Sequence, residues 1–165
     1  MKIRTIGAAA VLALALTACG GSGDDEKAST NLADSIMDSS SATFEVTQDQ
    51  ADCIGEGFVD EIGTDQLVDY KILDEDLEAA DGLDSVKMSE DDAQAAADTM
   101  QNCADIKEIF TGAMGELPEE AQTCIDEKLT DDVLNEFLVA VFTDDQEAGT
   151  QGLMGALTEC MAAAG

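Results

Sequence analysis

The chain has no histidine and no tryptophan, and only 7 of its 165 residues are basic against 37 acidic ones. Without histidine, neither a Ser-His nor a Cys-His catalytic pair can form. The formal net charge of −30 excludes binding to DNA or RNA, because such binding needs clustered lysine and arginine at the phosphates. The same shortage excludes electrostatic docking on an anionic membrane.

Other building blocks of catalytic sites are also scarce. The chain has 5 Phe and 1 Tyr, few of the aromatic platforms that sugar sites usually offer. It has no Cys-x-x-Cys motif, which argues against a redox dithiol and against a zinc site. Carboxylates are too numerous for any pair to stand out as a glycoside hydrolysis site. We therefore expect a protein that is not an enzyme and uses no cofactor.

The apolar content indicates a folded chain in spite of the charge. Hydrophobic residues make up 45% of the sequence, which is ordinary for globular proteins, whereas disorder also requires low hydrophobicity. From residue 44 onward, apolar residues recur at helical spacing and no stretch alternates as a strand does. The sequence predicts an all-α domain over 44–165, with about six or seven short helices and two disulfides.

Capping residues mark where these helices begin. Ile54, Phe58 and Ile62 lie four residues apart on one helical face. Thr47 with Gln50 is typical of a capping box before that helix. Further helix starts are predicted at Ser89, Pro118, Thr130 and Thr143.

The N-terminus has the pattern of an export signal. Lys2 and Arg4 supply the positive charge, and Ile6–Leu16 is an apolar run rich in Ala and Leu. This run is shorter than the roughly 20 apolar residues that span a bilayer. Residues 1–18 are therefore predicted to be a signal peptide.

The end of this segment, Leu16-Thr17-Ala18-Cys19, resembles the lipobox of bacterial lipoproteins. The resemblance implies that Cys19 becomes the first residue of the mature chain and carries acyl chains, palmitate among them. Such chains would hold the protein on the extracytoplasmic face of the cell membrane. The alternative is an ordinary secretory signal in which Cys19 has no role.

Small polar residues follow the cysteine, and they predict a tether. Residues 19–43 contain Gly20-Gly21-Ser22-Gly23 and Ser39-Ser40-Ser41, with little apolar material. Only Leu32, Ile36 and Met37 suggest a weak helical turn. As flexible coil, such a segment has an end-to-end distance of about 27 Å. We expect a lipid-anchored flexible tether over 19–43.

A faint internal repeat divides the domain into two halves. Cys53-Ile54 matches Cys124-Ile125, and apolar residues follow each pair at equal intervals. Each half ends with a large apolar residue three positions before a cysteine, as at Met100 and Leu157. The longer first half contains an acidic insertion loop around 71–86.

Four cysteines remain beyond Cys19, and an oxidising compartment favours pairing them. Cys53, Cys103, Cys124 and Cys160 permit three connectivities. The repeat places each predicted pair on the first and last helix of one half. It therefore favours disulfides Cys53–Cys103 and Cys124–Cys160.

One acidic loop has part of a calcium motif. Asp74, Asp76 and Glu78 resemble the opening of an EF-hand loop and are candidate ligands for weak, millimolar calcium binding. Ala79 stands where the motif needs glycine, and Ser85 where it needs the bidentate glutamate. The alternative is a solvated acidic loop without a metal.

Three glycines recur in the last segment at Gly149, Gly152 and Gly155. They are compatible with two helices that approach closely. They are equally compatible with a flexible loop before the last helix, because each interior glycine costs about 1 kcal/mol relative to alanine.

A second resemblance covers most of 44–165. Ala51-Asp52-Cys53-Ile54, Asp60-Glu61-Ile62-Gly63, Leu67 and Met100-Gln101-Asn102-Cys103 resemble a disulfide-paired helical domain of uncharacterised secreted proteins and lipoproteins of actinobacteria. The second half departs from the pattern, since no glycine follows Val133. The resemblance implies a fold and a location, and no activity.

These expectations combine into a lipid-anchored extracytoplasmic interaction or solute-binding module whose partner is an unknown envelope protein or ligand. The alternative is a divalent-cation-binding or salt-adapted surface protein, and a carboxylate-based enzyme comes third. An apolar pocket between the halves would favour binding. A featureless acidic surface would favour the second function, and two buried, facing carboxyls would favour the third.

Overall fold

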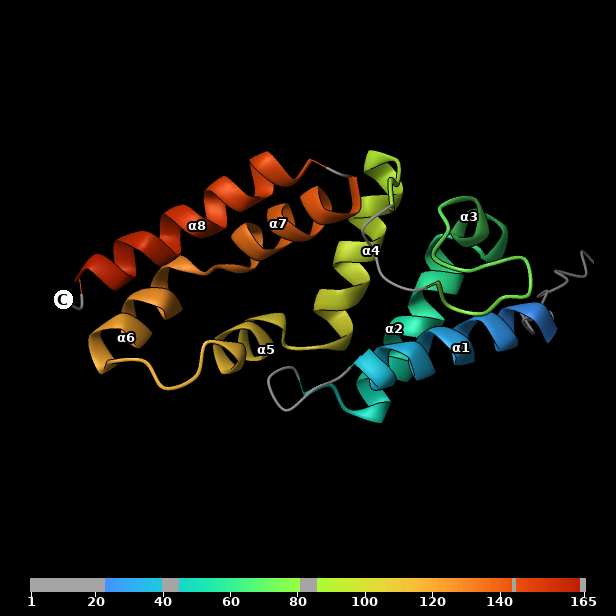
Figure 1. Cartoon of the computed structure of the whole chain (residues 1–165), viewed down its shortest axis with the longest axis horizontal. Helices are drawn as coiled ribbons and strands as arrows, with labels where there is room; N and C mark the ends of the chain where they lie inside the picture. The colour runs from blue at the N-terminus through green and yellow to red at the C-terminus, as the bar shows by residue number, and fades with distance from the viewer. Residues whose placement is uncertain (1–22, 40–44, 81–85, 144, 164–165) are drawn as a thin grey trace, which may run out of the picture.

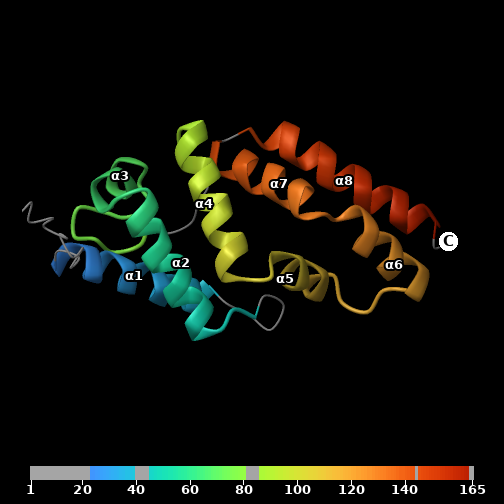
Figure 2. The ribbon, with the colours of Figure 1, turned by 180° about the vertical axis from the view of Figure 1, so that it is seen from behind.

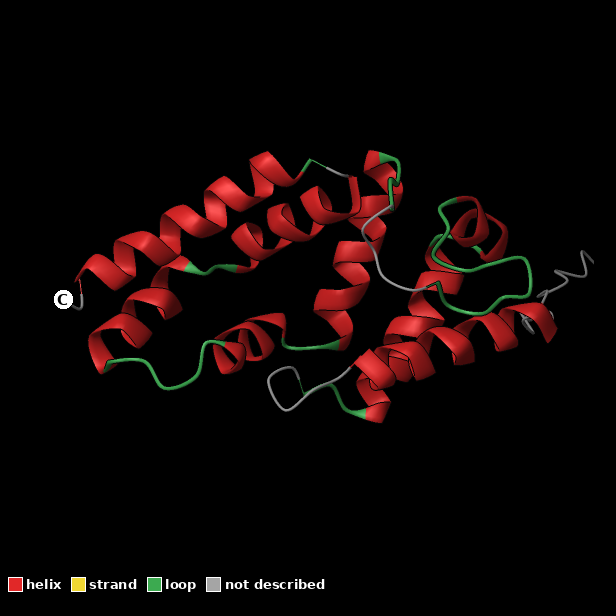
Figure 3. Ribbon diagram, viewed as in Figure 1, coloured by secondary structure: helices red, strands yellow, loops and turns green. Residues whose placement is uncertain are grey.

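The computed structural model describes residues 23–39, 45–80, 86–143 and 145–163, and these contain eight helices and no strand (Figures 1 and 3). The prediction of an all-α fold is confirmed, with seven helices after residue 44. In chain order the helices are α1 (Gly23–Ser39), α2 (Gln48–Glu61), α3 (Thr64–Asp69), α4 (Glu90–Cys103), α5 (Ile106–Ala113), α6 (Glu119–Lys128), α7 (Asp131–Thr143) and α8 (Gln146–Ala163).

The helix starts follow the capping residues of the sequence. Thr47 and Gln50 form the predicted capping box at α2. The hydroxyl of Ser89 accepts a hydrogen bond from the backbone N–H of Asp92 at 3.2 Å, and Pro118 directly precedes α6. The side chains of Thr47 and Ser89 thus satisfy backbone groups that a helix terminus leaves unpaired. The box predicted at Thr143 includes residue 144, which lies outside the described residues.

Buried residues form two hydrophobic cores that share α7. The larger core packs α1–α4 together, and α7 adds Leu138 and Phe142 to it. The smaller core consists of Ile125, Leu129, Leu134, Leu153 and Cys160, with contributions from α6, α7 and α8. Both views show α1 beside α2 and α7 beside α8 (Figures 1 and 2).

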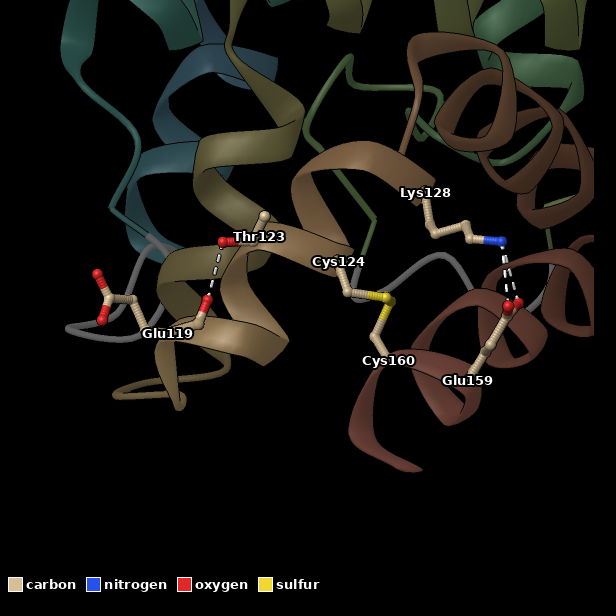
Figure 4. Close-up of a disulfide and its surroundings, with 6 residues drawn as sticks. All are labelled: Glu119, Thr123, Cys124, Lys128, Glu159 and Cys160. Carbon is tan, nitrogen blue, oxygen red and sulfur yellow. Dashed lines mark hydrogen bonds and ion pairs between the residues drawn. A yellow bond between two sulfur atoms is a disulfide. The ribbon is translucent and has the colours of Figure 1, made fainter. Parts of the chain in front are cut away.

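Two disulfides fasten the halves internally, and both predicted pairings are confirmed. Cys53–Cys103 joins α2 to α4 with a Cα–Cα distance of 5.5 Å. Cys124–Cys160 joins α6 to α8 with a Cα–Cα distance of 5.3 Å. An ion pair at 3.2 Å between Lys128 and Glu159 connects the same two helices beside the second bridge (Figure 4).

The tether prediction is wrong for residues 23–39, which form helix α1 and pack on α2. Ala28, Leu32 and Ala33 are buried, and Leu32 belongs to the larger core. A close helix contact explains this burial, since a Cβ added to Gly55 on α2 would collide with the backbone oxygen of Ser29. The polar composition of this segment favoured the tether prediction, although its buried residues Ala28, Leu32 and Ala33 form a narrow, mostly small-residue face of a helix.

The glycines of the last segment lie within α8, so the loop interpretation is wrong for residues 146–163. Of the three, Gly149 supports the close-approach interpretation. A Cβ at this position would clash with Cβ of Ala140 and lie 3.2 Å from Cα of Phe137, both on α7. A Cβ at Gly152 or Gly155 would meet nothing within 4 Å.

This difference predicts opposite effects for two glycine-to-alanine substitutions in one helix. We expect Gly149→Ala to lower the free energy of unfolding by about 1–3 kcal/mol, because it overpacks the α7–α8 contact. The matched control Gly152→Ala should raise it by about 0.5–1 kcal/mol through helix propensity alone. Urea denaturation followed by circular dichroism measures both, and equal effects would contradict the contact.

Candidate functional site

An apolar cavity of about 590 Å³ lies between the two halves. Its walls come from the C-terminal part of α1, from α2 and the segment after α3, from the end of α4, and from α5 and α7. The lining residues are Leu32, Ser35, Ile36, Ser39, Val46, Ile54, Gly55, Phe58, Ile72, Ala79, Ala80, Met100, Ala104, Ile106, Ile109, Phe110, Phe137, Leu138 and Phe142.

None of these lining residues is charged, although 27% of the chain is. Ser35 and Ser39, one turn apart on α1, carry the only side-chain hydroxyl groups of the lining. Ser35 is half-buried, while Ser39 and Ala80 are exposed. The cavity therefore opens to solvent near Ser39 and Ala80, and its deeper walls are hydrocarbon.

Two aromatic pairs stiffen the cavity walls. Phe58 on α2 and Phe142 on α7 meet edge to face with ring centroids 6.0 Å apart. Phe110 on α5 and Phe137 on α7 do the same at 6.2 Å. All four rings line the cavity, and such pairs contribute about 0.5–1.5 kcal/mol beyond their buried area. The first pair thus holds the α2–α7 side of the cavity, and the second is the ring contact between α5 and α7.

Helix α5 closes one side of the cavity without being firmly embedded. Ile106, Ile109 and Phe110 line the cavity, yet no residue of α5 is buried. The half-buried α5 side chains pack partly on each core. This helix is the most weakly held wall of the cavity.

A second hollow, of about 500 Å³, is polar and lies where α4 ends and α5 and α7 begin. Its lining includes Lys107, Asp105 and Asp131. The ammonium group of Lys107 already donates to the backbone oxygen of Asp126 at 2.7 Å and lies 3.5 Å from its carboxylate. The side chain of Gln101 donates to the backbone oxygen of Asp131 at 2.9 Å. These groups stabilise the junction of the helices.

The structure does not gather the candidate calcium ligands. One carboxylate oxygen of Asp74 accepts hydrogen bonds from the backbone N–H groups of Asp76 and Glu78, both at 2.9 Å. The loop also docks on α1, where Lys27 donates to the backbone oxygen of Asp76 at 2.7 Å. Asp74 therefore shapes a turn, and no group of three or more potential ligands is placed to hold a metal ion within the described ranges.

Among the described residues, Thr99 is the only buried one with a polar or charged side chain, so no described carboxyl group is buried. A carboxylate-based hydrolase needs an acid in an apolar environment to raise its affinity for a proton. The described residues therefore do not contain the two buried, facing carboxyl groups that would favour a carboxylate-based enzyme.

Sequence reasoning missed the cavity because its lining is drawn from distant segments. The sequence predicts the large apolar lining residues of α2, α4, α5 and α7 as core, but it places Leu32 and Ile36 in the tether and Ile72 in the insertion loop. One signal was present: Ala28, Leu32 and Ile36 are spaced four residues apart, which is typical of a helical face that packs on a partner.

The lipobox residues, including Cys19, lie outside the described residues, and so does the signal peptide. Among the helices that the structure describes, none is both long enough and apolar enough to cross a bilayer. Searches for similar proteins give no match for this chain among protein-family models, curated proteins or solved structures.

Proposed function

We propose that this protein is a non-enzymatic module that binds a small apolar molecule on the extracytoplasmic face of the membrane. The observation that carries the proposal is the uncharged cavity of about 590 Å³ between the two halves. Its volume falls within the range of about 300–1,000 Å³ that ligand pockets span. A cavity without charged lining residues in such an acidic chain is suited to an apolar ligand.

The driving force for such binding is burial of hydrocarbon. Each square ångström of apolar surface removed from water contributes about 25 cal/mol. Walls that are already formed reduce the ordering cost of binding, and the Phe58–Phe142 pair together with the Cys53–Cys103 bridge holds α2 in place. The two serine hydroxyls at the opening supply hydrogen-bonding groups for a polar end of the ligand.

The test uses N-phenyl-1-naphthylamine, an uncharged probe whose fluorescence rises in apolar surroundings. We expect saturable binding to the purified protein. Ile109→Trp should weaken it by more than about tenfold, because the larger ring occupies the cavity from a half-buried position. The fluorescence titration is excited above the tryptophan absorption band.

The matched control is Glu108→Trp, which adds the same ring at an exposed position of the same helix. This variant should bind the probe as the unmodified protein does. Thermal unfolding verifies that both variants fold. Absence of saturable binding, or unchanged affinity in Ile109→Trp, would overturn the proposal.

We propose further that a lipid on Cys19 anchors the protein. Four peptide units separate Cys19 from the first residue of α1, and they span at most about 14 Å. The helical domain would therefore lie against the lipid surface. Cys19→Ser should move the protein from the membrane fraction to the soluble fraction in cell fractionation, and an unchanged distribution would exclude lipidation as the anchor.

A further inference from the structure

We propose that the ligand of the cavity is a single-chain amphiphile whose head group carries no negative charge. The hydrocarbon tail lies among the apolar walls, and the head group lies at the opening beside Ser35 and Ser39. This inference rests on the proposed binding function and narrows it to one chemical class.

The lining supports the position of the tail. Away from the opening, the walls present aliphatic and aromatic side chains from both halves, such as Ile54, Met100 and Leu138. No charged or hydrogen-bonding side chain projects from these walls to receive a second polar group. A ligand with polar groups at both ends would leave one of them buried without a hydrogen-bond partner, which weakens its binding.

The opening supports the position of the head group. Ser35 and Ser39 are the only hydroxyl side chains of the lining, and they lie on one face of α1. Their exposure increases from half-buried Ser35 to exposed Ser39. A head group at this end is hydrated on one side and within reach of hydroxyl groups on the other.

The charge of the head group follows from the residues around the opening. Asp38 directly precedes Ser39, and Glu45 directly precedes the lining residue Val46; both acids are exposed. The whole chain carries a formal charge of −30. Lys107, which follows the lining residue Ile106 on α5, is paired with Asp126. An anionic head group is repelled here, while a neutral or cationic one is not.

The experiment is isothermal titration calorimetry at low salt with three ligands that share a dodecyl chain and differ in their head group. Each ligand is used below its critical micelle concentration. The ligands are dodecyltrimethylammonium, dodecyl maltoside and dodecanoate. We expect dodecanoate to bind about tenfold more weakly than the trimethylammonium ligand, with a gap that narrows as salt rises. Lengthening the chain of the neutral ligand from decyl to dodecyl should raise affinity about fourfold per added CH₂.

A matched pair of variants isolates the acids at the opening. Asp38→Asn with Glu45→Gln should reduce the difference between the cationic and anionic ligands. Glu119→Gln with Glu120→Gln, which removes the same charge from the first turn of α6, should leave that difference unchanged. Equal effects of the two double variants would overturn the assignment of the head group to this opening.

The outcomes separate the two proposals. If dodecanoate binds as tightly as the other ligands or more tightly, the head-group inference fails while the binding function stands. If N-phenyl-1-naphthylamine binds but affinity for the alkyl ligands does not depend on chain length, the tail assignment fails. If neither the probe nor any alkyl ligand binds, the proposed function itself fails.

Discussion

Replacing both cysteines of the Cys124–Cys160 bridge with alanine is expected to lower the free energy of unfolding by about 4 kcal/mol. The bridge closes a sequence separation of 36 residues, and the lost loop-closure entropy accounts for that magnitude. The smaller core has five buried residues, and Cys160 is one of them, with no exposed surface. The substitution therefore also removes buried sulfur from a core with few other contacts.

The matched comparison is the double alanine variant of Cys53 and Cys103. This bridge closes 50 residues, so loop entropy alone predicts a slightly larger loss. Cys53 is exposed, however, and the core on its side has sixteen buried residues. We expect the Cys124–Cys160 variant to be the less stable by about 1 kcal/mol, because burial outweighs the small difference in loop length.

Urea denaturation followed by circular dichroism measures both variants. Urea is preferable to guanidinium, which would screen the repulsion among the acidic side chains. A smaller loss for Cys124–Cys160 than for Cys53–Cys103 would contradict the role assigned to the buried sulfur.

The second large effect concerns α1. We expect Leu32→Ala to lower the free energy of unfolding by about 2–5 kcal/mol, the cost of emptying a core position. Leu32 is 6% exposed and contacts the larger core. A flexible tether would show no such loss, so this substitution tests directly whether α1 belongs to the folded domain.

Met37→Ala in the same helix is the control. Met37 is partly buried and is not among the residues packed on the larger core. Its removal should change the free energy of unfolding by about 0.5 kcal/mol or less. Thermal and urea unfolding measure the stability of both variants. Equally small losses in the two variants would show that α1 behaves as a tether.

The elements that the sequence predicted well are those specified locally. Thr47 with Gln50 and Ser89 mark helix starts through contacts three residues away, and both caps are confirmed. The repeat around Cys53 and Cys124 indicated which cysteines share a half. Such signals need only short stretches of chain, so they can be interpreted without knowing how the helices pack.

The elements that the sequence did not predict depend on contacts between distant segments. Helix α1 has few large apolar residues, and its burial depends on the close approach that Gly55 permits. The cavity depends on α1, α5 and α7 meeting around space that their side chains do not fill. Neither property is encoded in the periodicity of a single helix.

The position of α7 in both cores determines which part of the structure can move to widen the cavity. Because Leu138 and Phe142 belong to one core and Leu134 to the other, pulling the halves apart would expose apolar surface on both sides at once. Displacing α5 exposes far less, since none of its residues is buried. Widening of the cavity therefore exposes the least apolar surface when the two-turn helix α5 moves and the other helices keep their places.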